Sequence, residues 1–237
     1  MSRPNLFTLD TWGRHENLVL EVFRCALVRL EGESDLPEDE NRLNRKVYFL
    51  VLKENRRLLE EGRGCRSPIM YESRNQPAAE TPDPLEREWK RPDFKCGFVD
   101  SQSEYPLFLD LECKRLGHRS SGGSVFNKLY IEKGVRRFID VDSGYGEGVT
   151  SGAMIGYLQT MSPDDILNEV NGYATKVNVP AINGTDRPWI DRGVTRLNQT
   201  LGRKMSPSPF LLRHLWLDLR HRYATHTSRS RGGVNAA

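Results

Sequence analysis

The sequence predicts an α/β fold, and three observations lead to this prediction. Two segments with helical spacing of apolar residues open the chain of 237 residues. Three short strand-like segments follow them, and a further helix and strand come after the Gly122-Gly123 break. This order indicates a sheet covered by helices, because each element has to bury one apolar face.

Two helices are expected before Gly62. The first spans about residues 11–30, where side chains recur along one side at helical spacing. The second spans about residues 38–61. Pro37 precedes this second helix, three acids occupy its first turn near the positive end of the helix dipole, and Gly62 follows its end.

Alternating or apolar segments bounded by turn residues predict the strands. The expected elements of this middle part are strands at about 68–72, 94–100 and 107–115, a helix at 124–139 and a strand at 152–160. A polar turn, residues 101–106, joins the second and third of these strands.

A further helix is expected to begin at Ser162, because Ser162 can cap it, Pro163 fits its first turn and Asp165 lies near its positive end. A strand at about 210–220 follows. We expect a single domain over residues 1–225, with its core at about 38–160, and a basic, flexible tail over residues 226–237.

Composition excludes several classes of protein. The longest apolar run, Val47 to Leu52, is too short to span a membrane, and no signal peptide is visible, so a cytoplasmic protein without membrane contact is expected. The four cysteines lack the spacing of a zinc site. Residues 187–237 contain ten Lys or Arg and two Asp, which makes this segment either a phosphate-binding surface or a solvated tail.

Charged residues are concentrated on one face of the strand at 107–115. Because side chains alternate along a strand, Asp110, Glu112 and Lys114 share a face, and Asp93 opens the preceding strand. The same alternation is also typical of the solvated face of an antiparallel sheet, with Glu112 and Lys114 bridging to neighbouring strands.

The pair Pro92-Asp93 and the triplet Glu112-Cys113-Lys114 resemble the motif of the PD-(D/E)xK, or restriction-endonuclease-like, nuclease superfamily. The resemblance covers about residues 67–160. It implies a restriction-endonuclease-like core of order α-β-β-β-α-β, here with an added N-terminal helix and a C-terminal helix and strand. It also implies that Asp93, Glu112 and Lys114 are catalytic, that Asp93 and Glu112 bind Mg²⁺, with Mn²⁺ as an alternative, and that Lys114 lies beside the phosphate.

The chemistry of phosphodiester hydrolysis agrees with these residue types. The reaction needs an activated water and neutralisation of the charge that develops on the phosphate. Magnesium takes one or two protein carboxylates and leaves its other positions to water and phosphate oxygens. A lysine near one ligand supplies a compact positive charge.

Basic residues after the triplet are expected to bind nucleic acid: Arg115, Arg119, Lys128, Lys133, Arg136 and Arg137. Other residues are weaker candidates. Glu21 or Glu54 could add a helix acid to the metal site but are expected at the surface. Asp110 is expected either beside the metal ligands or exposed, and Gln159 could touch the substrate.

The expected function is therefore that of a divalent-metal-dependent endonuclease acting on DNA, in the setting of prokaryotic restriction or anti-phage defence. A non-catalytic nucleic-acid-binding or assembly subunit with the same fold and an RNA-directed nuclease stay open as alternatives. Because no separate reader of base sequence is evident, we expect a homodimer or a partner protein that supplies target selection.

Overall fold

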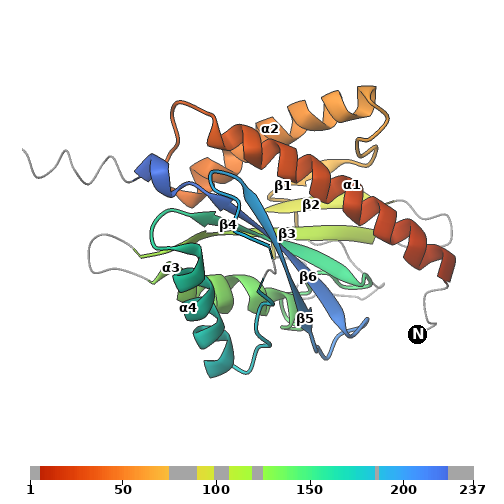
Figure 1. Cartoon of the computed structure of the whole chain (residues 1–237). Helices are drawn as coiled ribbons and strands as arrows, with labels where there is room; N and C mark the ends of the chain where they lie inside the picture. The colour runs from red at the N-terminus through yellow and green to blue at the C-terminus, as the bar shows by residue number, and fades with distance from the viewer. Residues whose placement is uncertain (1–5, 75–89, 99–106, 119–124, 185–186, 224–237) are drawn as a thin grey trace, which may run out of the picture.

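The computed structural model describes residues 6–74, 90–98, 107–118, 125–184 and 187–223. Its strands form one six-stranded sheet in the order β1-β2-β3-β4-β6-β5 (Figure 1). β3 is parallel to β4 and β4 to β6, whereas the other neighbours are antiparallel. The strands are β1 (Ile69–Tyr71), β2 (Phe94–Phe98), β3 (Leu107–Leu116), β4 (Ser151–Leu158), β5 (Val194–Leu201) and β6 (Phe210–Asp218).

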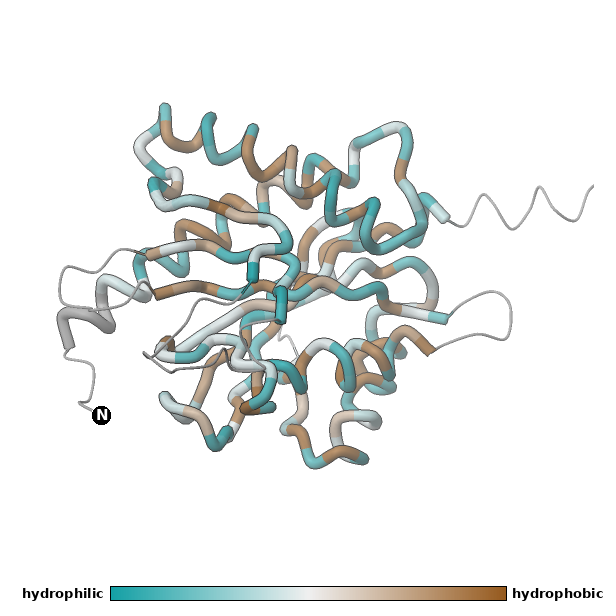
Figure 2. Tube along the Cα trace, turned by 180° about the vertical axis from the view of Figure 1, so that it is seen from behind, coloured by the Kyte–Doolittle hydropathy of each residue, from teal (hydrophilic) through white to brown (hydrophobic). Residues whose placement is uncertain are grey.

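Helices cover both faces of this sheet. The helices α1 (Leu6–Glu31) and α2 (Glu40–Glu60) lie on one side, and α3 (Phe126–Leu129) and α4 (Pro163–Lys176) lie on the other (Figure 1). Figure 2 shows apolar and polar residues alternating along the helices, as expected where one helix face meets a sheet. None of the described helices is both long and apolar enough to cross a membrane.

The central strands are buried on both sides because of these two layers. Every residue of β4 is buried, and β3 is buried from Leu109 to Cys113. Close packing requires a glycine on β4, since a Cβ at Gly156 would lie 2.5 Å from Leu116 Cδ1 and 2.8 Å from Trp216 Cδ1. Charged residues in the middle of β3 are therefore buried, which is unusual without a partner.

The segment that follows β3 is helical but irregular, in contrast to the single helix expected over residues 124–139. α3 continues into a π-helical turn, η2 (Tyr130–Gly134), and then a 3₁₀ turn, η3 (Val135–Phe138). The break falls at Gly134, where a Cβ would lie 2.5 Å from Met154 Cε and 3.4 Å from Lys114 Cγ. Glycine thus lets the segment pack closely over β3 and β4 at Lys114.

The predicted order of elements is found, from α2 through β1, β2, β3 and the helical segment to β4, with α1 before it and α4 and β6 after it. Ser162 caps α4 as predicted, accepting a hydrogen bond from Asp165 N. β5 was not predicted, because Arg196, Asn198 and Thr200 make it look like a polar loop although it is an edge strand. The turn at 101–106 and the tail at 226–237 lie outside the described residues.

Candidate active site

Asp93, Glu112 and Lys114 converge where β2 begins. β2 and β3 are antiparallel neighbours with Phe94 opposite Leu111, so Asp93 lies beside the Glu112-Cys113 bond. Cys113 N donates to Asp93 Oδ2 at 2.7 Å, and Lys114 Nζ lies 2.9 Å from Glu112 Oε1. The three residues that the sequence predicts as catalytic therefore share one location.

Glu112 is the most deeply buried of the three, with 1% of its surface exposed. Its Oε1 forms ion pairs with both Lys114 Nζ and Arg137 Nη1, and the distance to Arg137 Nη1 is 2.7 Å. Its Oε2 is buried and has no hydrogen-bond partner among the described residues. A buried carboxylate oxygen without a partner is costly, so this atom is positioned for a ligand that the protein itself does not supply.

Glu40, the first residue of α2, also reaches the site, and this was not predicted. Its Oε1 accepts from Lys114 Nζ at 2.8 Å and its Oε2 accepts from Arg115 N at 3.1 Å. Residues 38–40 were interpreted only as favourable charge at a helix start, which Asp39 does provide by capping Arg42 N at 3.1 Å. The acids at residues 38–40 were visible in the sequence, but the start of a helix was enough to explain them.

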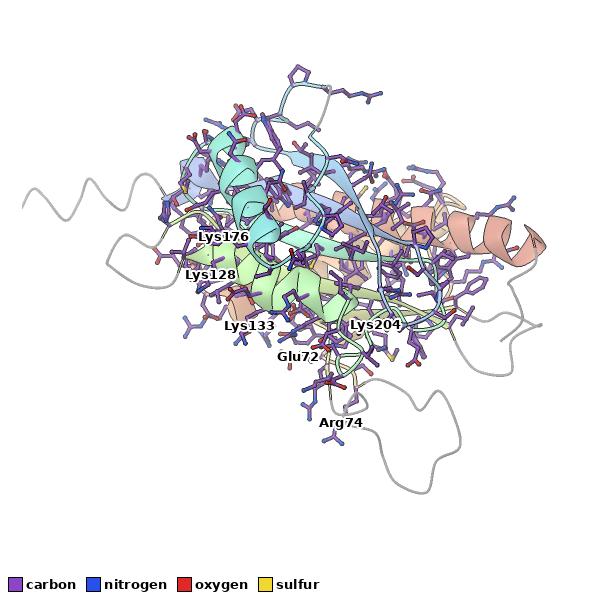
Figure 3. The ribbon with its side chains drawn as sticks, turned by 90° about the horizontal axis from the view of Figure 1, so that it is seen from below. Glu72, Arg74, Lys128, Lys133, Lys176 and Lys204 are labelled. Atoms are coloured by element: carbon purple, nitrogen blue, oxygen red, sulfur yellow. The ribbon has the colours of Figure 1, made fainter. Side chains whose placement is uncertain are left out.

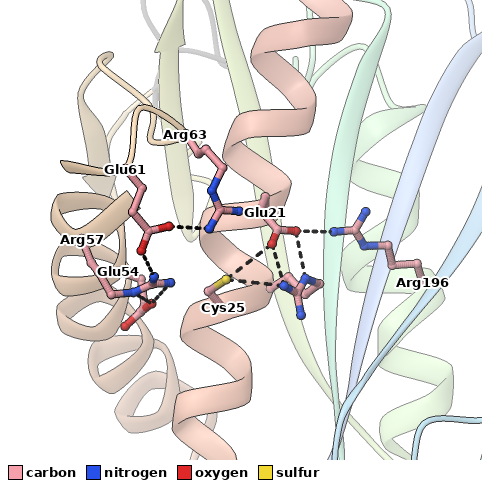
Figure 4. A network of polar contacts seen from close by, with 8 residues as sticks. Glu21, Cys25, Glu54, Arg57, Glu61, Arg63 and Arg196 are labelled. Carbon is pink, nitrogen blue, oxygen red and sulfur yellow. Dashed lines mark hydrogen bonds and ion pairs between the residues drawn. The ribbon is translucent and has the colours of Figure 1, made fainter. Parts of the chain in front are cut away.

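Neither of the helix acids considered from the sequence contacts this site. Glu21 pairs with Arg24 and Arg196 on the side of α1 (Figure 4). Glu54 is buried rather than at the surface, and it pairs with Arg29. It also pairs with Arg57 (Figure 4). Both acids belong to ion-pair networks that link α1 to α2 or to β5.

Burial and mutual repulsion shift the protonation of the two candidate metal ligands. Burial, followed by the charge of Glu112, raises the pKa of Asp93 to about 7. Burial likewise raises the pKa of Glu112. Burial alone would lower the pKa of Lys114, but the charges of Glu112, Glu40 and Asp93 outweigh it and raise that pKa, so the lysine stays cationic. The site thus holds more negative charge than its cations neutralise.

This arrangement fits a divalent cation held by Asp93 and Glu112. Among the described residues no group of three or more His, Cys, Asp or Glu side chains is placed to hold a metal, and Glu40 bonds to Lys114. Two carboxylates match the sparse protein ligation that Mg²⁺ prefers. The unpartnered Glu112 Oε2 and the raised pKa of Asp93 are what such a cation would relieve.

Asp110 has a different role from either of those expected for it. It is neither exposed nor in contact with the candidate metal ligands. Only 2% of it is exposed, its Oδ1 lies 2.8 Å from Lys95 Nζ on β2, and its Oδ2 accepts from Gly146 N at 2.9 Å. The alternation on β3 therefore carries a structural ion pair next to the candidate catalytic group.

Three of the predicted basic residues line one pocket beside Glu112. This pocket, called here the η3 pocket, has a volume of about 580 Å³ and is lined by Lys90, Arg91, Glu132, Lys133, Arg136, Arg137, Asp140, Ser143 and Tyr145. Five of these residues are cationic and two are acidic. Arg137 connects the pocket to the candidate catalytic group, because its Nη1 bonds both Glu112 Oε1 and, at 3.1 Å, Tyr145 Oη.

The other predicted nucleic-acid contacts lie elsewhere. The guanidinium of Arg115 stacks 4.2 Å from the centre of the Phe126 ring and donates to Glu38 O, which indicates a structural role. Lys128 is at the surface (Figure 3) and pairs with Glu132 at 3.8 Å. Arg119 lies outside the described residues. Gln159 does not point to a substrate pocket, because its Nε2 donates to Glu38 O at 3.0 Å.

Tyr145 is a pocket residue that the sequence analysis missed. It lies in a loop with glycines at 144, 146 and 148, all with positive φ between 65° and 76°. Buried Arg203 holds this loop by donating to the carbonyls of Tyr145, Gly146 and Val149. The repeated glycines were the available signal, since a residue with a side chain is strained at such φ values.

A comparison with protein-family models, with curated proteins and with solved structures finds no match to this chain. The resemblance to PD-(D/E)xK nucleases therefore rests on Pro92-Asp93, on the Glu112-Cys113-Lys114 triplet and on the order of the elements that carry them.

Proposed function

We propose that this protein is a divalent-metal-dependent endonuclease that hydrolyses phosphodiester bonds in DNA, with a restriction-endonuclease-like core. The observation that carries the proposal is the buried Glu112, whose Oε2 has no partner in the described part of the chain. This carboxylate lies next to Asp93 and Lys114. Strongly shifted carboxylates gathered with a lysine are typical of catalytic sites.

Each residue has a distinct role in this proposal. Asp93 and Glu112 would hold the cation, which when bound supplies an activated water and a charge that stabilises the transition state. Lys114, kept protonated by three acids, would neutralise the attacked phosphate. Glu40 positions Lys114 through its 2.8 Å contact, so Glu40 acts on the phosphate only through the lysine.

The η3 pocket supports a polyanionic substrate. Lys133 and Arg136 are exposed there, and Arg137 joins the pocket to Glu112. Phosphates on either side of the cleaved bond would find cations within this pocket. The same cations would serve RNA, so the assay below includes RNA as the alternative substrate.

The direct test is cleavage of supercoiled, linear and single-stranded DNA and of RNA, with Mg²⁺ or Mn²⁺ and with excess chelator. We expect metal-dependent cleavage of DNA, and a loss of roughly a hundredfold or more in Asp93→Asn, Glu112→Gln and Lys114→Ala. Glu16→Gln is a matched control, because Glu16 is a buried acid that pairs with Arg213 on another part of the sheet. Full activity in chelator, or in Glu112→Gln, would refute the proposal.

A second test separates substrate binding from chemistry. The double variant Arg136→Ala, Arg137→Ala should weaken binding of unrelated DNA sequences about equally. It should also make the salt dependence of affinity shallower by roughly one unit per lost phosphate contact. The measurement is fluorescence anisotropy at several salt concentrations without metal. An unchanged slope would show that neither arginine contacts a phosphate.

We further propose that target selection comes from a second copy or from a partner protein in a restriction or anti-phage system. The described residues contain one sheet with its covering helices, and little else that could read base sequence. Light scattering of the purified protein, together with its cleavage pattern, tests this. A monomer that cuts one defined DNA sequence without a partner would contradict it.

A further inference from the structure

A second pocket lies at the β5 edge of the sheet. This pocket, called here the β5 pocket, has a volume of about 990 Å³. It is lined by Arg24 and Val28 of α1, by residues 194–198 of β5 and by parts of the segment 187–193. β5 is the last strand in the order β1-β2-β3-β4-β6-β5, so one of its edges faces away from the sheet (Figure 1).

The backbone of β5 offers hydrogen-bonding groups to this pocket. Asn183 N donates to Asn198 O at 2.9 Å on the edge that faces away from β6. In an antiparallel pair alternate residues direct their N–H and C=O groups to the same edge, so Val194 and Arg196 also direct theirs outward. In the described part of the chain no backbone group pairs with these two residues. A strand edge of this kind can accept a further strand.

The side chains around this edge are mainly cationic. Four arginines line the pocket, at positions 24, 187, 192 and 196, against one acid, Asp191. Glu21 neutralises part of this charge from the side of α1, where it contacts Arg24 at 2.6 Å and Arg196 at 3.0 Å (Figure 4). Hydrogen bonds from Arg24 lower the pKa of Glu21 to about 2, so this acid is ionised and already paired. Among the described lining residues, arginines therefore outnumber acids.

The outer wall of the pocket is held in place and is partly apolar. Trp189 stacks on Trp216 with ring centres 5.9 Å apart, and its Nε1 donates to Asp164 Oδ1 at 2.8 Å. Ile190 N donates to Thr195 Oγ1 at 3.1 Å. The Ile190 side chain is nevertheless 52% exposed, and Val28 across the pocket is 43% exposed. These two apolar side chains lie within an otherwise charged lining.

We propose that the β5 pocket binds an extended segment of a partner protein in which acidic and apolar residues alternate, and that this segment adds a strand to β5. Its backbone would pair with Val194 and Arg196, its acids would meet the arginines on the α1 side, and its apolar side chains would cover Ile190. Because the pocket shares no residue with the candidate active site, this inference does not depend on the proposed nuclease activity.

Two other occupants fit the pocket less well. A second copy whose β5 paired antiparallel to this one, about a two-fold axis perpendicular to the strand, would bring Arg192 and Arg196 of both copies together, and opposed like charges are destabilising. A nucleic acid would satisfy the arginines, but phosphates only accept hydrogen bonds. They would therefore leave the outward carbonyls of β5 unpaired and Ile190 uncovered.

The test uses the full chain and a fluorescein-labelled heptapeptide of alternating glutamate and valine, with binding followed by fluorescence anisotropy in chelator. We expect binding at least tenfold tighter than that of the lysine-valine counterpart and of an acidic peptide methylated on alternate backbone nitrogens. Arg196→Ala should weaken binding severalfold. Arg196→Pro should weaken it further, because proline removes an outward N–H without breaking the β5–β6 ladder.

The matched control is Arg56→Ala, which removes an exposed arginine from α2 and should leave peptide affinity unchanged. Circular dichroism and the melting temperature verify that Arg196→Pro folds. If this variant does not fold, the methylated peptide still tests backbone pairing with the wild-type protein. Equal affinity for acidic and lysine peptides, or no effect of Arg196→Ala, would overturn the proposal. The proposal would also be overturned if Arg196→Ala lost affinity for duplex DNA but kept its affinity for the peptide. A dimer of the wild type that Arg196→Pro dissociates would overturn it as well.

Discussion

Two groups of buried charged residues lie on the same face of β2 and β3, and they differ in the balance between acids and cations. In the first, Lys95 and Asp110 form one pair at 2.8 Å, with 3% and 2% of their surfaces exposed. In the second, the acids Asp93, Glu112 and Glu40 face the two cations Lys114 and Arg137, and Glu112 Oε2 has no partner among the described residues. The two groups are only two residues apart on β3.

The difference shows why a strand pattern alone cannot separate structure from function. Both groups place acids and a lysine at alternate positions along the two neighbouring chain segments. Each group has a buried carboxylate oxygen without a hydrogen bond among the described residues, but Asp110 Oδ1 lies 2.8 Å from Lys95 Nζ. Only the second group combines excess negative charge with a carboxyl whose pKa is raised to about 7. An unbalanced buried group has a stability cost, which a bound cation would offset.

The largest effect is expected from breaking the balanced pair of Lys95 and Asp110. Asp110→Ala leaves the Lys95 ammonium buried without its partner and removes the acceptor of Gly146 N, so the free energy of unfolding should fall by about 3–5 kcal/mol. Replacing both residues with Lys95→Met and Asp110→Leu should recover most of this loss, since a buried pair is often no more stable than apolar packing. Chemical denaturation measures both. A loss below about 1 kcal/mol would contradict the structural assignment.

A smaller effect is expected from cation binding to the unbalanced group at Asp93 and Glu112. Saturating Mg²⁺ should stabilise the wild type by about 2.7 kcal/mol at a hundred times its Kd, which corresponds to a rise of about 5–10 °C in Tm for a chain of this size. Glu112→Gln should abolish this rise, whereas Glu16→Gln should retain it. An equal Mg²⁺ response in Glu112→Gln would show that the cation binds elsewhere.

A third effect concerns pH. Because the pKa of Asp93 is about 7 in the folded protein and 3.8 as its ordinary value, the folded state binds an extra proton between these limits. The stability of the wild type in chelator should therefore fall, relative to Asp93→Asn, as pH rises from about 4 to about 7, and then level off. At pH 8 the variant should melt at a higher temperature than the wild type. Parallel melting curves at all pH values would contradict this account.

The sequence was most informative where one physical pattern dominated. The capping at Ser162, the acid-rich start of α2 and the apolar segments of β2 to β4 gave these elements correctly, within a few residues at their ends. β5 was missed because an edge strand needs only one apolar face, and its exposed positions carry polar side chains. The irregular turns at 130–138 follow from the tertiary contact of Gly134 with Met154, which no local pattern encodes.

The candidate site could be predicted only in part, because some of its contacts are between residues far apart in the sequence. Asp93, Glu112 and Lys114 lie on neighbouring strands, so strand alternation was enough to bring them together. Glu40 is 72 residues before Glu112 in the chain and Arg137 is on a helical turn across the sheet face, so neither contact follows from local spacing. The burial of Asp110 stayed open because the sequence does not show that the loop at Gly146 packs against it.

The hydrogen bond from Cys113 N to Asp93 Oδ2 gives the site a spectroscopic reporter. This amide lies in a buried central strand, where exchange with solvent requires large-scale opening, so its resonance should persist in deuterated water. Its acceptor is the carboxylate whose protonation and cation binding are in question. The Cys113 amide shift should therefore follow the titration of Asp93 near pH 7, and the addition of Mg²⁺ should move that titration to lower pH.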